Sequence, residues 1–225
     1  MDQIQDRIDL ATALRLATHF GLNEGICNHF SLAIDADRFL LNPHGIHWSQ
    51  IQAKDIIEVN PATMDSEAEV SAFNIHHAIH QTSEHARCVL HTHMPYATAL
   101  TCLTDNTLKF IHQNSLRFYN DVAYDNEYNG LADALAEGAR IASCLQDKRV
   151  LFLANHGVIV IGANVAEAFD RMYYLERACE VQILAMSTGQ PLRDIGANLA
   201  NKTRQEFDRE HSYAQAHFDA LRVLV

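Results

Sequence analysis

The sequence has few of the features that divide a chain into separate parts. Its 225 residues include only 4 prolines and 9 glycines. These are scattered singly, and no linker rich in Pro, Gly or Ser separates one segment from the next. Internal repeats and low-complexity segments are also lacking. With 48% hydrophobic residues, a chain of this length can bury one sizeable core. We therefore expect a single domain over residues 1–225.

Basic charge and long apolar runs are also scarce. The chain has 17 Lys and Arg against 28 Asp and Glu, a net charge of -11, whereas nucleic-acid binding needs concentrated basic residues. The most apolar stretch, 150–161, is interrupted by Asn155-His156-Gly157 and is too short to span a bilayer. The N-terminus lacks the pattern of a signal peptide. We expect neither a nucleic-acid partner nor a membrane span.

The 5 cysteines form no disulfide framework. They are odd in number, far apart, and include no Cys-x-x-Cys motif, so they are expected to be free thiols in a reducing compartment. We therefore expect a cytoplasmic protein.

The hydrophobic pattern predicts interspersed helices and strands. Helices are expected over 4–20, 70–82, from Pro95 onward, 131–144, 165–186 and 202–221. Strands are expected over 30–34, 38–42, 55–59, 87–93, 150–153 and 158–161. Several neighbouring strands are joined too tightly for parallel crossovers. The prediction is a mixed, largely antiparallel sheet with helices packed against it.

Histidine is what the chain has in excess, with 14 residues. His91 and His93 are two apart on a predicted strand and so share one face. His156 lies in the short connection 154–157, where Gly157 is expected to adopt a backbone conformation closed to other residues. Three neutral imidazoles with one open position form a catalytic metal site, usually of zinc. Since three-His sites do not select one metal by geometry, Fe2+ and Mn2+ are alternatives to Zn2+.

Four segments together resemble the class II aldolase/adducin family, in its adducin-like branch. They are 69–100, with His91-Thr92-His93-Met94-Pro95-Tyr96-Ala97-Thr98-Ala99, then 154–157, 24–31 and 42–45. The resemblance implies a three-layer α/β/α sandwich and a homotetramer with sites at subunit boundaries. It places His91, His93 and His156 on the metal-ligand positions. It also implies substrate-binding roles for Asn28, His29, His44, Gly45 and Ser71.

The chain departs from the aldolase pattern at the proton-transfer residue. The family's glutamate position corresponds to Ala72, and the nearest acid is Glu69, one helical turn earlier on the same face. Glu69 is therefore the catalytic candidate, with helix capping as the alternative role. Val70 replaces a serine that helps to hold phosphate in aldolases, so a sugar phosphate is disfavoured. His29 and His44 are candidates to bind a carboxylate or another anion instead.

The leading interpretation is a metal-dependent lyase acting on a small hydroxy- or oxo-carbonyl compound through a metal-stabilised enolate. One alternative is decarboxylation, dehydration or epimerisation on the same metal site. Others are an iron-dependent oxygenase and a non-enzymatic, adducin-like interaction domain. Because adducins have lost the metal histidines and this chain retains all three, an enzyme is favoured.

Overall fold

The computed structural model describes residues 3–60, 68–132, 134–210 and 212–225, and is built around one seven-stranded sheet. The strands lie in the order β3-β2-β1-β4-β7-β6-β5. Every neighbouring pair is antiparallel except β5 and β6. The predicted mixed, largely antiparallel sheet is confirmed. In chain order the strands are β1 (His29–Ala33), β2 (Phe39–Leu41), β3 (Ile57–Val59), β4 (Cys88–Thr92), β5 (Val122–Asp125), β6 (Val150–Leu153) and β7 (Gly157–Gly162).

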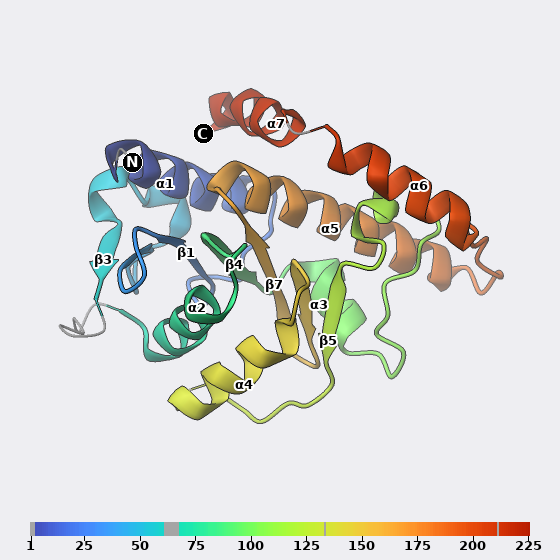
Figure 1. The fold of residues 1–225 in the computed structure, drawn as a ribbon, viewed down its shortest axis with the longest axis horizontal. Helices are drawn as coiled ribbons and strands as arrows, with labels where there is room; N and C mark the ends of the chain where they lie inside the picture. The colour runs from blue at the N-terminus through green and yellow to red at the C-terminus, as the bar shows by residue number, and fades with distance from the viewer. Residues whose placement is uncertain (1–2, 61–67, 133, 211) are drawn as a thin grey trace.

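Helices cover both faces of the sheet, as Figure 1 shows, so the predicted three-layer α/β/α sandwich is confirmed. One face packs on α1, α3 and α5, and the other on α2 and α4. The helices are α1 (Gln3–His19), α2 (Val70–Thr82), α3 (Pro95–Thr101), α4 (Leu135–Leu145), α5 (Val165–Ser187), α6 (Ala197–Asp208) and α7 (Tyr213–Leu221).

The alternation of side chains along β4 decides which face carries the functional residues. Cys88 and Leu90 enter the core formed with α1 and α5, while Val89 packs against α2 and α4. His91, two residues after Val89, therefore points toward the α2 side. β1 pairs with β4 so that His29 lies opposite His91, and both side chains share this face.

The helix expected over 131–144 begins later, at Leu135, and two other parts of the chain differ more from the sequence prediction. The single helix predicted over 202–221 is two helices, α6 and α7, because each packs on a different element. α6 lies against the segment 113–118, whereas α7 places Phe218 on Phe169 of α5. The short strand β5 escaped prediction because it pairs in parallel with β6 across a long connection.

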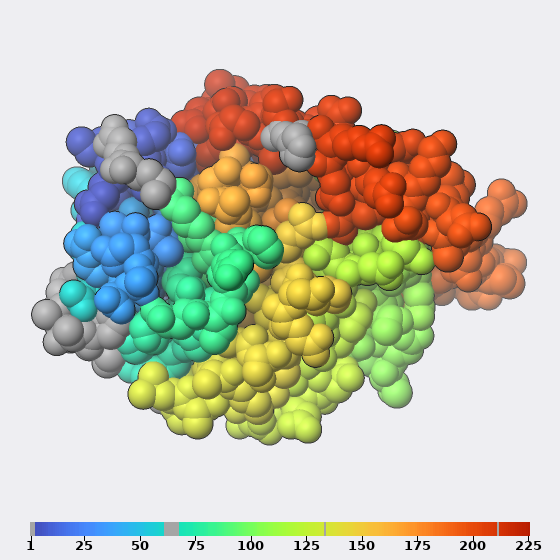
Figure 2. Space-filling view, viewed as in Figure 1, coloured from blue at the N-terminus to red at the C-terminus, as the bar shows by residue number. Residues whose placement is uncertain are grey.

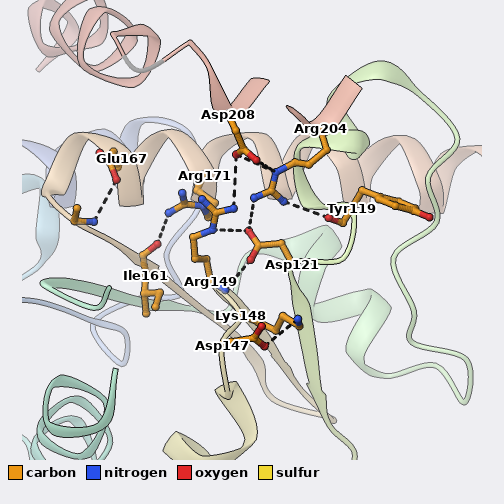
Figure 3. A network of polar contacts seen from close by, with 11 residues as sticks. Tyr119, Asp121, Asp147, Lys148, Arg149, Ile161, Glu167, Arg171, Arg204 and Asp208 are labelled. Carbon is orange, nitrogen blue, oxygen red and sulfur yellow. Dashed lines mark hydrogen bonds and ion pairs between the residues drawn. The ribbon is translucent and has the colours of Figure 1, made fainter. Parts of the chain in front are cut away.

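A network of charged side chains fastens α6 to the sheet (Figure 3). The carboxylate of Asp121, just before β5, accepts hydrogen bonds from Arg149 at 2.7 Å and Arg204 at 3.2 Å. Arg204 also pairs with Asp208. Burial raises the pKa of Asp121 to about 6, although Arg204 and Arg171 oppose that shift. The network holds α6 against the strand end, and Figure 2 shows the C-terminal segments along one edge of the molecule. No helix of the described segments combines the length and apolarity needed to cross a membrane.

Candidate metal centre

Three imidazoles converge at one end of the sheet. His91 is the last residue but one of β4, His93 directly follows the strand, and His156 lies in the turn between β6 and β7. Because β7 pairs with β4, that turn is brought beside the end of β4. The ring centroids are 5.0 Å apart for His91 and His93, and 4.8 Å apart for each of them with His156. One ligand atom from each ring lies within 4.8 Å of the other two.

Two of the three rings each use Nδ1 in a hydrogen bond to the protein, which turns their Nε2 atoms toward a common point. Nδ1 of His91 donates to the carbonyl oxygen of Val158 at 3.0 Å, and Nδ1 of His93 donates to Glu24 at 2.7 Å. Each ring therefore keeps a bare Nε2. These Nε2 atoms are 3.2 Å apart. A tetrahedral zinc with Zn–N bonds of about 2.0–2.1 Å needs roughly 3.3 Å between ligand nitrogens. The residues fit a zinc ion.

Burial keeps two of the rings, His91 and His156, neutral, as metal binding requires. It lowers the pKa of His91 well below its usual value, with the neighbouring histidines adding to the effect. Burial also lowers the pKa of His156 to about 4. A neutral imidazole carries a lone pair that is ready to bind a divalent cation without first losing a proton.

The turn that carries His156 is built differently from the prediction. The left-handed residue is Asn155, with φ of 56°, and not Gly157. Gly157 is required because a Cβ there would lie 2.6 Å from the carbonyl oxygen of Thr92 and 2.8 Å from the His93 ring. The glycine thus allows β7 to approach the end of β4 closely, which brings His156 to the other two histidines.

A cavity of about 520 Å³ opens over the three histidines. Of the residues predicted to bind substrate, Asn28, His29, His44 and Ser71 line this cavity, as does Glu69. Gly45 does not line it, although its φ of 83° shapes the loop beside His44. Other lining residues that sequence reasoning did not single out as site residues include Ile26, Asn42, Thr98 and Leu131.

Glu69 has a defined structural role in this cavity wall. It is the N-cap of α2, and its carboxylate accepts hydrogen bonds from the backbone N–H groups of Ser71 and Ala72. The Ser71 hydroxyl donates to the same carboxylate at 2.7 Å. Burial raises the pKa of Glu69, but these hydrogen bonds outweigh it and bring the pKa below its usual value. Glu69 is therefore an ionised carboxylate with three donors already in place.

Sequence reasoning missed two functional neighbours of the centre. One is the contact between Glu24 and His93, which links residues 69 positions apart. The other is a pair of histidines behind the cavity wall, His76 and His80, on the side of α2 that faces the sheet. Their spacing of four residues places them on one helix face, and this was a signal available in the sequence.

Comparison with known proteins decides the family. The model of the family described as class II aldolase and adducin N-terminal domain matches residues 8–183. The chain belongs to the class II aldolase/adducin family. A Pseudomonas aeruginosa protein whose name assigns it provisionally to class 2 aldolases is 34% identical over 197 residues, 85% of this chain and 75% of that protein. Human beta-adducin is 28% identical over 84% of this chain, and the match spans 27% of its own length.

Solved structures of the class II aldolase/adducin family share the whole fold. A crystal structure of an aldolase II superfamily protein from Pseudomonas syringae superposes with a TM-score of 0.88, at 31% identity, covering 97% of this chain and 91% of that one. L-fuculose 1-phosphate aldolase from Glaciozyma antarctica gives a TM-score of 0.86 at 25% identity, covering 99% and 90%.

Proposed function

We propose that this protein is a metal-dependent lyase of the aldolase type, acting on a small hydroxy- or oxo-carbonyl compound. The observation that carries the proposal is the convergence of His91, His93 and His156, with bare Nε2 atoms 3.2 Å apart on the first two, below an open cavity. Membership of the class II aldolase/adducin family supports metal-dependent aldolase-type chemistry.

The chain's own residues would hold the metal and orient the substrate. Zinc is the proposed ion, and when bound it supplies electrophilic stabilisation of the substrate enolate. Glu24 fixes the His93 ring, and the carbonyl of Val158 fixes His91. Asn28 anchors the loop of Glu24, because its Oδ1 accepts from the Glu24 backbone N–H at 2.7 Å. Its buried side-chain NH2 has no partner among the described residues and is a donor available at the cavity wall.

Elemental analysis of the purified protein tests the metal assignment. We expect close to one zinc per chain, lost in His156→Ala and kept in His85→Ala, which removes an exposed histidine outside the centre. Iron in place of zinc would favour oxygen chemistry. If neither the parent protein nor His85→Ala held a metal, the lyase proposal would fail and an adducin-like interaction domain would replace it.

The role of Glu69 separates two reaction types on the same metal site. Its position on the cavity wall and its ionised state support a role in accepting a proton, whereas its lowered pKa makes this carboxylate a weaker base. Its role as N-cap of α2 favours instead decarboxylation, dehydration or epimerisation, with another group moving the proton. Glu69→Gln should lower turnover at least 100-fold if this carboxylate transfers the proton. Unchanged turnover would leave it as a helix cap alone.

A homotetramer with cavities at subunit boundaries is part of the proposal. Apolar side chains at the mouth of the cavity are exposed, with Leu131 at 79%, Tyr128 at 56% and Ile26 at 40%. Their grouping around one opening supports coverage by a second subunit. A cytoplasmic location is also proposed, in keeping with five free cysteines. Light scattering of the zinc-loaded protein tests the tetramer.

A further inference from the structure

A row of buried and partly buried hydrogen bonds leads from the cavity wall through the protein to a single backbone carbonyl. Nδ1 of His29 lies 2.6 Å from Nε2 of His76, and Nδ1 of His76 is hydrogen-bonded to the hydroxyl of Ser31. The same hydroxyl lies 2.8 Å from Nε2 of His80. Nδ1 of His80 lies 2.7 Å from the carbonyl oxygen of Ala86. Strand β1 supplies two members of this row, and α2 supplies the other two.

The carbonyl at the end of the row fixes the direction of every hydrogen bond in it. A carbonyl only accepts, so His80 carries its proton on Nδ1 and, when neutral, has a bare Nε2. Ser31 must then donate to His80, which leaves its oxygen to accept from Nδ1 of His76. By the same logic His76 has a bare Nε2 and accepts from Nδ1 of His29. Each neutral ring is held in one tautomer by the group to which its Nδ1 donates, namely Ala86 for His80, Ser31 for His76 and His76 for His29.

Burial keeps the rings of this row neutral. It lowers the pKa of His76 well below its usual value, and it lowers the pKa of His80 to about 4. The row lies in the protein interior, where a satisfied polar network is well defined and an unsatisfied one is costly. The donor and acceptor roles fixed by the Ala86 carbonyl therefore extend along the row to His29, because no ring in it carries a charge at neutral pH.

The end of the row lies beside the three metal-binding residues. The His29 and His91 rings are 4.7 Å apart and inclined by only 31°. His29 lines the cavity, and its Nε2 makes no hydrogen bond within the described part of the chain. That atom lies outside the group formed by the ligand atoms of His91, His93 and His156. The lone pair of His29 Nε2 is therefore left to accept a hydrogen bond from a bound molecule. The nearby carboxylate of Glu69 already accepts hydrogen bonds from backbone N–H groups of its own helix, α2.

We propose that Nε2 of His29 accepts a hydrogen bond from a hydroxyl of the substrate, and that the row through His76, Ser31 and His80 holds it in this role. A carboxylate or phosphate oxygen has no proton to donate, so its lone pairs would face the lone pair of His29 Nε2. The anion-binding role considered for His29 is thereby replaced by selection of hydroxy-carbonyl compounds. This inference rests on the proposed function for its substrate, but not for the tautomer of His29.

The tautomer is measured directly in metal-free protein labelled with 15N-histidine, by long-range proton–nitrogen correlation. We expect His29 and His76 to be protonated at Nδ1 and bare at Nε2. Ser31→Ala removes the acceptor of His76 and should shift His29 toward the Nε2-protonated form. His77→Ala, on the same helix but outside the row, should leave both rings unchanged. A parent protein with His29 protonated at Nε2, or a Ser31→Ala variant without change, would overturn the inference.

Substrate selection is measured with hydroxyacetone and methoxyacetone, which share a carbonyl and differ in that a methyl group replaces the hydroxyl proton. Dissociation constants are compared for zinc-loaded parent protein and for His29→Phe with its zinc content verified. We expect the preference for hydroxyacetone to fall about tenfold in the variant, as loss of one hydrogen bond predicts. An unchanged preference would overturn the role. If neither ketone bound the parent protein, the proposed function would fail, and the tautomer measurement would decide the inference alone.

Discussion

Gly157→Ala should damage the metal centre without touching a ligand. The added Cβ would lie 2.6 Å from the carbonyl oxygen of Thr92 and 2.8 Å from the His93 ring. Since ordinary contacts begin near 3.4 Å, β7 and the end of β4 must separate by about 0.8 Å. Functional sites tolerate displacements of only about 0.5 Å. The substitution therefore strains the strand pair and pulls His156 and His93 apart.

The expected size of the effect follows from these displacements. Overpacking of this kind lowers the free energy of unfolding by about 1–3 kcal/mol. Misplaced ligands should weaken zinc binding by about 10–100-fold, as loss of an orienting partner does. Urea denaturation of the zinc-free protein measures the first quantity, and competition with a chromophoric chelator measures the second.

Gly138→Ala is the matched control for Gly157→Ala. A Cβ at Gly138 would lie 2.4 Å from the carbonyl oxygen of Asn74, where α4 crosses α2 away from the metal ligands. It should cost a similar amount of stability while leaving zinc affinity unchanged. The reasoning is refuted if Gly157→Ala binds zinc as tightly as the parent protein, or if both variants lose zinc equally.

Three further predictions concern single interactions. Glu24→Gln should weaken zinc binding about 10–100-fold, because the amide is a poorer acceptor for Nδ1 of His93; chelator competition checks this, and unchanged affinity contradicts it. In zinc-free protein, His80 has a folded pKa of about 4, whereas the unfolded value is about 6.5. As pH falls from 6.5 to 4 only the unfolded state gains its proton, so stability should fall by up to about 1.4 kcal/mol per pH unit from this group. His80→Gln should remove that part of the slope in urea denaturation, and parallel slopes would rule the assignment out. Asp121→Ala should lower the free energy of unfolding by about 1–3 kcal/mol, because the buried Arg204 loses one of its two carboxylate partners and keeps Asp208. Denaturation at pH 8 measures this, and a loss well below about 1 kcal/mol would show the network to be dispensable.

Local patterns in the sequence already indicated a mixed sheet with helices packed on it and singled out the three histidines proposed as metal ligands, whereas the three-layer arrangement followed from the family resemblance. His91 and His93 share a face because side chains on a strand alternate. The tight connection at 154–157 predicted a hairpin carrying His156, and the structure contains that hairpin. The break between α6 and α7 could not be read in the same way, because both segments keep a helical pattern. Only the elements on which they pack separate them.

The tertiary structure alone decided how the histidines are used. Nothing local links His29 to His76, 47 residues later, or His93 to Glu24, 69 residues earlier. Strand register and the packing of α2 bring these side chains together, and the hydrogen bonds that result select which nitrogen of each ring is bare. The sequence determined that imidazoles gather at one end of the sheet. Long-range packing decided which of them face a metal and which one faces a substrate hydroxyl in the proposal, because tautomers are set by partners and not by neighbours in the chain.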